Sequence, residues 1–482
     1  MMINSIEKDF TGRLTMWGIN CSFAFSIGFL LAIRPVESET ETFVNKCRTF
    51  KGNFDSLDWV YGKSFADLDY AFHPSAEQGP ACFFRGTLML VIDIVLQATN
   101  AKNPDGEYLF DYIDLQGFTA IDFTGKAVDA VFLPKAVLVK TPGRNRKIEW
   151  MHYDDYSKAF DTEVEGTPCK LVFSTFVDRD DFDLETNSLG AIHSIIRLIF
   201  PERQDLSMIE HCWEAVCAFL AFCVGQLNVT TLSVGLWDQK NPDKLDLFGN
   251  IDCIINSDKV DDIQSIYPTT YRFPVSILGE KVGQLFQLLN DKTRKPVLGF
   301  LRKTNSDIAV DRNKIRELCT ACETEFDYRK EELSDSEINA LVNALRTTVK
   351  QYKIDHPDAI AKDEYGYISS SISAISKPAR KKILCIHKKY KDFVDSHFAG
   401  FTMFTPNDHP NVSDKQTEED IGWLTKTRNS ITHSAGVIDT EIPNYIFARL
   451  KVSVLCSILE RASYSLEEIR EIIDQYFSGI IF

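Results

Sequence analysis

The sequence lacks the long apolar segments and cofactor motifs that define several large protein classes. Hydrophobic residues make up 44% of its 482 residues, yet no apolar run reaches the ~18 residues that a membrane span needs. The sequence has no GxxxxGK[ST] phosphate loop and no GxSxG nucleophile turn. These absences argue against a membrane-spanning protein and a nucleotide-driven motor, and we expect a cytoplasmic protein that does not contact a membrane.

An excess of positive charge is also missing. The formal net charge is -16, which argues against a protein that coats nucleic acid by general attraction. The twelve cysteines follow no regular framework, as is typical of small buried side chains in a reducing compartment. The CxxC formed by Cys319 and Cys322 has no second CxxC or paired histidine after it, so we interpret it as packing.

No metal or other cofactor is expected. The densest acidic cluster, DRDDFDLE at residues 178–185, offers several carboxylates, but a metal site needs oxygens that converge on one point. A strand end or a solvated loop is the commoner structure for such a run. The β-rich front part of the chain shows no nucleophile and base at a recognisable spacing, so an enzyme of its own remains a third and weaker hypothesis.

The hydrophobic pattern predicts an α+β multidomain chain with a β-rich first part, residues 1–302. Short apolar runs such as residues 21–33 alternate with turn sequences such as NPDGEY at 103–108, which favours an antiparallel sandwich or open barrel. Helical spacing appears near residues 186–226. There we expect two helices, one over 188–200 and one over 206–225.

The second part, residues 303–482, is predicted to be an all-α bundle of five or six helices. Apolar residues recur at helical spacing through most of this part. The last two segments have broad apolar faces that suit a bundle core and, in part, a helix–helix dimer interface. The expected helices cover 311–333, 334–353, 377–397, 415–433, 442–462 and 465–477.

One segment of this bundle carries a possible catalytic pair. Arg428 and His433 lie five positions apart in TRNSITHSAG, residues 427–436. On an ideal helix five steps separate two side chains by about 140°, so they share no face unless the helix ends or distorts. Gly436 favours such an end shortly after the histidine. We expect Arg428 on the last regular turns, with His433 able to swing back from the loosened end.

These residue types suit phosphate chemistry. An arginine stays charged and grips phosphate oxygens with a planar fork of donors, and a histidine exchanges a proton near neutral pH. Together they can assist the attack of an RNA 2′-hydroxyl on the adjacent phosphate without a metal. Asn429 is placed to hold the substrate or to orient the histidine.

The spacing alone is weakly specific, because Arg146 with His152 and Arg380 with His387 come close to it. The first of these pairs falls in a loop-rich region and the second within a basic helix. The pair at 428 combines an asparagine after the arginine, a helix end and a position in a C-terminal bundle.

That combination, with the motif RNSITH, resembles the HEPN superfamily, and the domain order over nearly the whole chain looks like the ApeA family of anti-phage proteins. The resemblance implies a metal-independent endoribonuclease of abortive defence, with Arg428 and His433 as the catalytic pair and Asn429 in support. It implies a homodimer through the C-terminal domain, an RNA substrate with tRNA among the candidates, and a phage-derived trigger sensed by the N-terminal domain.

A basic run offers a candidate RNA-binding surface within KPARKKILCIHKKYK, residues 377–391. Its cations could follow an RNA backbone while Tyr390 stacks on a base. The alternative is a solvated helix face, with His387 on it, whose apolar side packs inward. The second hypothesis for the whole bundle is likewise a non-catalytic one, in which it binds a protein or nucleic-acid partner. The candidate RNA-binding residues are Lys381, Lys382, Lys388, Lys389 and Tyr390.

Overall fold

A computed structural model gives the architecture of the chain. The chain divides into two compact units, the first with residues 1–266 and 273–290 and the second with residues 267–272 and 291–482. The structure describes residues 9–26, 28–49, 59–75, 82–84, 86–99, 109–116, 156–177, 192–224, 231–237, 247–255, 273, 275–291, 312–329, 336–357, 361–375, 379–398, 414–433 and 444–478.

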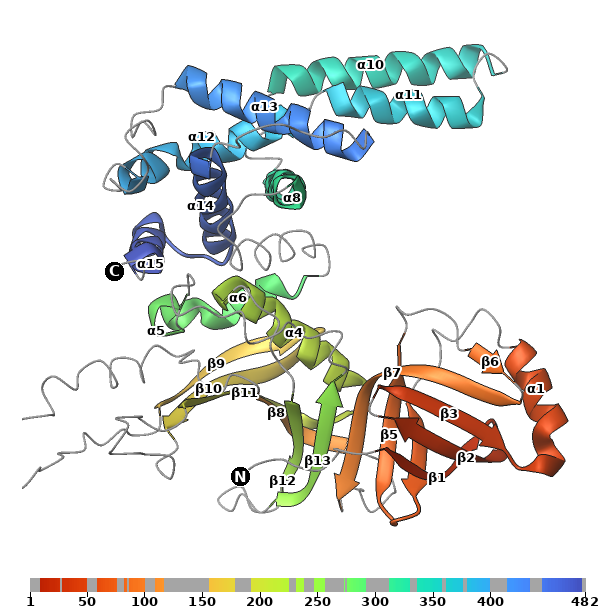
Figure 1. The fold of residues 1–482 in the computed structure, drawn as a ribbon. Helices are drawn as coiled ribbons and strands as arrows, with labels where there is room; N and C mark the ends of the chain where they lie inside the picture. Colours follow the sequence, from red (N-terminus) through yellow and green to blue (C-terminus); the bar gives the residue numbers. More distant parts are fainter. Residues whose placement is uncertain are drawn as a thin grey trace, which may run out of the picture. The chain divides into compact units, whose positions relative to one another are not determined.

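The first unit contains a closed antiparallel barrel (Figure 1). Its strands follow the order β3-β2-β1-β4-β5-β7, and a further pairing between β3 and β7 closes the ring. Buried and exposed residues alternate along β1 and β2, because successive side chains of a strand point to opposite faces. The strands are β1 Phe10–Met16, β2 Ile19–Ser26, β3 Leu30–Pro35, β4 Val60–Ser64, β5 Asp69–Pro74 and β7 Thr87–Thr99.

Aromatic side chains fill the interior of this barrel. The Phe10 ring stacks on Tyr70 with 4.1 Å between the ring centroids, and Phe72 is fully buried beside them. A short 3-10 turn, Glu37–Glu39, leads into helix α1, Thr40–Thr49, which adds its buried Phe43 to the same core. The apolar run at residues 21–33 therefore forms parts of two barrel strands, as the sequence predicted.

Strand β7 also joins the barrel to a second antiparallel sheet, which continues in the order β7-β13-β12-β8-β11-β10-β9. Short strand β6, Cys82–Phe84, pairs with β7 outside this path. Helix α4, Ser207–Val224, packs on this sheet through Phe219, whose ring contacts Phe173 of β10. The strands are β8 Leu109–Gln116, β9 Tyr156–Val164, β10 Thr167–Val177, β11 Ile192–Asp205, β12 Thr231–Trp237 and β13 Leu247–Ile255.

The prediction of a helix over residues 188–200 was wrong, since β11 begins at Ile192. Side chains Ile196, Leu198 and Phe200 are buried while the residues between them are partly exposed, which is the period of a strand. Several β-branched isoleucines in this run also favour a strand over a helix. The second helix predicted in this region is confirmed as α4.

The second unit is a bundle of packed helices, drawn from green to blue in Figure 1. Seven helices occur among its described residues, against five or six predicted, and α11 is the one that was missed. A capping box starts α15, where Ser465 and Glu468 each accept a hydrogen bond from the other's backbone N–H. The helices are α8 Arg312–Tyr328, α10 Ser336–Asp355, α11 Lys362–Ile375, α12 Ala379–Phe398, α13 Asp414–His433, α14 Asn444–Arg461 and α15 Leu466–Ser478.

None of the helices within the described ranges combines the length and apolar character that a membrane span requires. The CxxC pair is confirmed as packing material, because Cys319 and Cys322 are fully buried in α8. Burial raises the pKa of the Cys319 thiol to about 12, so this thiol is not a reactive one near neutral pH.

A helix and a strand lie in close contact at Gly283, and a substitution there tests the packing of the first unit. The chain continues through α5, Val275–Leu278, and a 3-10 turn, Gly279–Lys281, into α6, Val282–Leu289. A Cβ added to Gly283 of α6 would overlap the carbonyl oxygen of Asp161 in β9. We expect Gly283→Ala to lower the free energy of unfolding by about 1–3 kcal/mol, since the backbones must separate.

The measurement is thermal unfolding of the full chain, with Gly366→Ala as the matched control. Gly366 lies inside α11 with no neighbouring atom within 4 Å of the added Cβ. That change should be neutral or stabilising by about 0.5–1 kcal/mol. Equal effects of the two substitutions would contradict the packing described here.

Candidate active site

The predicted catalytic pair lies on the C-terminal part of helix α13. The described helix covers Asp414–His433, and residues 434–443 lie outside the described residues, so the stop that Gly436 favours stays a prediction. Both Arg428 and His433 belong to the helix, and their backbone positions differ by about 7.5 Å along its axis and about 140° around it. The His433 side chain lies outside the described residues, so its approach to Arg428 stays a prediction.

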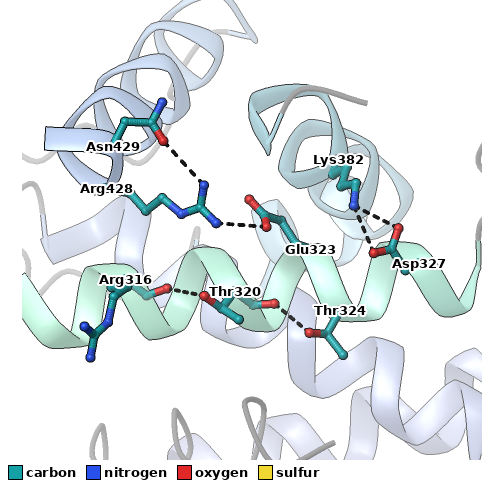
Figure 2. Close-up of polar contacts among 8 residues, drawn as sticks. All are labelled: Arg316, Thr320, Glu323, Thr324, Asp327, Lys382, Arg428 and Asn429. Carbon is teal, nitrogen blue, oxygen red and sulfur yellow. Dashed lines mark hydrogen bonds and ion pairs between the residues drawn. The ribbon is translucent and has the colours of Figure 1, made fainter. Parts of the chain in front are cut away.

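Arg428 reaches from α13 to a carboxylate on α8, as Figure 2 shows. Its Nη2 donates to Glu323 Oε2 at 3.1 Å, and its Nη1 lies 3.4 Å from Asn429 Oδ1. The Arg428 side chain is 28% exposed and that of Glu323 is 19% exposed. The guanidinium is therefore half-buried and held in one place, while Asn429 is exposed beside it. Asn429 thus contacts the arginine of the predicted pair.

The acceptor face of α8 carries two carboxylates one turn apart, Glu323 and Asp327. Residues at i and i+4 of a helix lie on the same side, and here each meets a cation from a different helix (Figure 2). Lys382 of α12 donates to both oxygens of Asp327 at 2.9 Å. Two ion pairs thus connect α8 to α13 and to α12.

Burial has the largest effect on Glu323 and raises the pKa of its carboxyl group. The charges of Arg428 and Lys382 oppose this effect and favour the ionised form. One oxygen, Glu323 Oε1, is buried and has no hydrogen-bond partner among the described residues. A carboxylate can accept several hydrogen bonds, so this residue can hold Arg428 and still receive a further donor.

The predicted RNA-binding run occupies α12, and most of its cations are paired with acidic groups. Lys388 binds Glu418 at 2.9 Å and remains the more exposed of the paired lysines, whereas Lys389 binds Glu460 at 3.2 Å and is mostly buried. Lys382 is also mostly buried in its pair with Asp327. Lys381 lies partly buried on the same helix. This arrangement differs from an open cationic strip, because the acidic neighbours reduce its positive potential.

Tyr390 and His387 do not lie on an exposed face of α12, which corrects two expectations. Tyr390 is 2% exposed and its hydroxyl donates to Glu460 at 2.6 Å, so its ring is not available to stack on a base. His387 is 1% exposed, and its Nδ1 lies 3.5 Å from the Ser453 hydroxyl. The apolar side of α12 packs inward as the alternative interpretation predicted, since Ile383 and Ile386 are fully buried.

The apolar faces of the last two helices serve mainly the core of the unit. Ile469, Ile472 and Ile473 of α15 are buried, as are most residues of α14. Exposed large apolar side chains of the bundle lie on the paired helices α10 and α11, at Leu341, Tyr352, Ile354 and Tyr367, and at Leu466, the first residue of α15. A dimer interface through this unit stays a prediction.

Sequence reasoning did not identify Glu323, although the structure brings it to Arg428. These two residues are 105 positions apart, and an acidic residue on a predicted helix carries no spacing signal of its own. The acidic cluster at 178–185 and the Arg146 with His152 pair lie outside the described residues.

Comparisons with known proteins found no relative of this chain. No family model, curated protein or solved structure matches the chain.

His387 makes the stability of the bundle depend on pH. Burial, helped by nearby Arg449 and Lys391, lowers the pKa of His387 from 6.5 to about 4. Between these values the unfolded chain binds more protons than the folded one, so stability is full above pH 6.5 and falls as the pH decreases toward 4. The loss attributable to this group is up to about 3 kcal/mol.

We expect the melting temperature of wild type to fall more steeply between pH 6.5 and 4 than that of His387→Gln. The variant is less stable overall but keeps every carboxylate, so the difference in slope isolates this imidazole. Parallel pH profiles for the two proteins would show that His387 titrates normally in the folded chain.

Proposed function

We propose that the chain is a metal-independent endoribonuclease of the HEPN type, in which Arg428 and His433 act on one RNA phosphodiester. The observation that carries the proposal is the placement of Arg428. It lies half-buried against Glu323, on the helix that ends at His433. Asn429 adds a polar contact to the same guanidinium.

In this proposal Arg428 binds the scissile phosphate. A guanidinium has five N–H donors, so it can keep its bond to Glu323 and still present donors to phosphate oxygens. Fixing the group before substrate arrives places positive charge where negative charge develops on phosphorus, which is the most effective form of electrostatic stabilisation. Glu323 is the residue that orients it.

His433 handles the protons of the reaction. The 2′-oxygen attacks phosphorus as its proton is removed, a bond between phosphorus and the 2′-oxygen forms, and the bond to the 5′-oxygen breaks as that oxygen gains a proton. A histidine is suited to one of these transfers near neutral pH. The products are a 2′,3′-cyclic phosphate and a 5′-hydroxyl.

Two copies of the chain supply the site in this proposal. Because Arg428 and His433 leave one helix about 140° apart, a phosphate contacted by both is more readily enclosed by two such helices facing each other. The resemblance to HEPN proteins supports the same arrangement. It also supports a role in anti-phage defence, with RNA such as tRNA as substrate and the β-rich unit sensing a phage-derived trigger.

The contact between Arg428 and Glu323 also favours a second candidate function, that of a bundle without catalytic activity. The ion pair of Arg428 with Glu323 joins α13 to α8, and a half-buried pair of this kind can serve stability alone in a bundle that binds a partner without catalysis. The two readings differ in whether loss of Arg428 affects RNA cleavage beyond its effect on folding.

RNA cleavage by the purified full chain in the presence of EDTA tests the proposal. We expect His433→Ala to slow cleavage by about 100- to 10,000-fold, because a proton-transfer group is lost. His356→Ala, an exposed histidine of the same unit, is the matched control and should cut at the wild-type rate. Cleavage by His433→Ala at the wild-type rate, or a dependence of wild-type cleavage on added metal, would contradict the assignment.

A double-mutant cycle with Arg428→Met and Glu323→Gln separates the two readings. We expect the two side chains to couple by about 1–2 kcal/mol in the free energy of unfolding, as partly buried partners do. Cleavage should be measured at a temperature where all variants are folded. The proposal predicts a much larger loss of cleavage for Arg428→Met than for Glu323→Gln, whereas equal losses that follow stability favour the structural reading.

A further inference from the structure

A cluster of metal-binding side chains lies in the first unit, far in sequence from the candidate active site. It contains His73 of β5, Asp93 of β7 and Glu210 in the first turn of α4. Each offers one ligand atom, and these atoms lie within 4.8 Å of one another. Three residues from three elements therefore converge on one point between the barrel strands and the helix.

A β-bulge explains why Asp93 faces this point. Phe72 pairs with Val95 and His73 with Ile94, but Pro74 pairs with Ile92, so Asp93 is an extra residue in β7. A bulge re-aims a side chain relative to the regular alternation of a strand.

The pattern of core residues along β7 shows this change of side-chain direction. Leu88, Leu90 and Ile92 of β7 lie in the core at every second position, and the next core residue is Val95. The side chains of Asp93 and Ile94 therefore do not belong to the barrel core. At a bulge two residues of one strand lie opposite one residue of the partner, so Asp93 and Ile94 both lie opposite His73, which follows the core residue Phe72 and points away from the barrel core.

The distances suit a first-row metal ion. His73 Nε2 lies 3.4 Å from Glu210 Oε2, and two ligands of one tetrahedral ion at bond lengths near 2.1 Å are separated by about 3.4 Å. The ligand atoms lie within 4.8 Å of one another, so the largest separation would close by at most about 1.4 Å on binding, which side-chain rotations can supply. Three protein ligands leave at least one position on the ion for water.

Charge and burial also favour a divalent metal ion at this site. Asp93 is 2% exposed, and a bound dication would stabilise the charge of a carboxylate at this depth. Two carboxylates and one neutral imidazole balance the charge of a dication. This mixture of nitrogen and oxygen ligands is typical of Zn²⁺ and Mn²⁺ sites, and less so of Mg²⁺.

Two neighbouring polar atoms also indicate a ligand. His73 Nδ1 is buried and has no hydrogen-bond partner among the described residues, and the same holds for Trp59 Nε1. The Trp59 ring packs on the imidazole with 5.1 Å between ring centroids, which limits access of bulk water from that side. Unsatisfied buried groups are uncommon in proteins. Trp59 Nε1 is a donor, and His73 Nδ1 becomes one when Nε2 binds a metal, so a water molecule beside the site, rather than the ion itself, would satisfy them.

We propose that His73, Asp93 and Glu210 bind one Zn²⁺ or Mn²⁺ ion that ties the bulged strand β7 and strand β5 to helix α4. No metal was expected from the sequence, and this site departs from that expectation. The inference does not rest on the proposed ribonuclease activity, since all three ligands belong to the first unit.

The test uses the full chain stripped with EDTA and passed through a desalting column. We expect it to bind about one equivalent of Zn²⁺ or Mn²⁺ by calorimetry and to melt at a higher temperature with the metal, because binding to the folded state stabilises it. Asp93→Asn and Glu210→Gln should each weaken binding by at least about 10-fold. Glu210→Gln is the safer variant, because this side chain is 34% exposed.

His211→Gln is the matched control. His211 follows Glu210 on α4 and lies 3.8 Å from Glu165, but that pair is not part of the three-residue cluster. It should leave the affinity and the metal-dependent rise in melting temperature unchanged. Failure of the wild-type chain to bind either ion, or equal binding by wild type and Glu210→Gln, would overturn the proposal.

Discussion

The ion pair between Arg428 and Glu323 is the interaction on which the interpretation of the C-terminal unit depends. It joins α13 to α8 and fixes a guanidinium five residues before a helix end. Without Glu323, the long arginine side chain would lose rotamer freedom when it bound a phosphate, and that loss opposes binding. With it, the positive charge is in place beforehand. The same face of α8 fixes α12 through Asp327 and Lys382, so the bundle is organised around paired charges on one helix.

The N-terminal unit depends on a different constraint. Strand β7 belongs both to the barrel and to the second sheet. One strand closes the barrel with β3 and also carries the second sheet through β13. Its side-chain alternation has to change where the strand passes from one role to the other, and the bulge at Asp93 makes that change. In the proposed site, a metal ion held with His73 and Glu210 would add to the stabilisation of the buried Asp93 charge at this point.

The sequence predicted the elements whose signal is local and periodic. Six helices of the bundle were predicted because their apolar residues recur at helical spacing. Helix α11 was missed because its serines and Gly366 are poor helix formers, so its helical state depends on packing against α10. The prediction of a helix over 188–200 failed because a continuous apolar run does not distinguish the helical period from the strand period well.

In each unit, contacts between residues that lie far apart in the sequence could not be predicted from the sequence. Glu323 meets Arg428, and His73 meets Asp93 and Glu210, only through the fold. The basic run at 377–391 looked open in sequence because its acidic partners, Asp327, Glu418 and Glu460, come from other helices. Charge patterns along one helix therefore overstate the exposed charge when neighbouring helices supply the counter-ions.

The most direct measurement of the central claim is the single-turnover rate of RNA cleavage by Arg428→Lys. A lysine keeps the positive charge and can pair with Glu323, but it lacks the planar fork that holds a phosphate through two hydrogen bonds. The account predicts a melting temperature close to that of wild type and a rate lower by about 100-fold or more. A lysine variant that cuts RNA at the wild-type rate would contradict it.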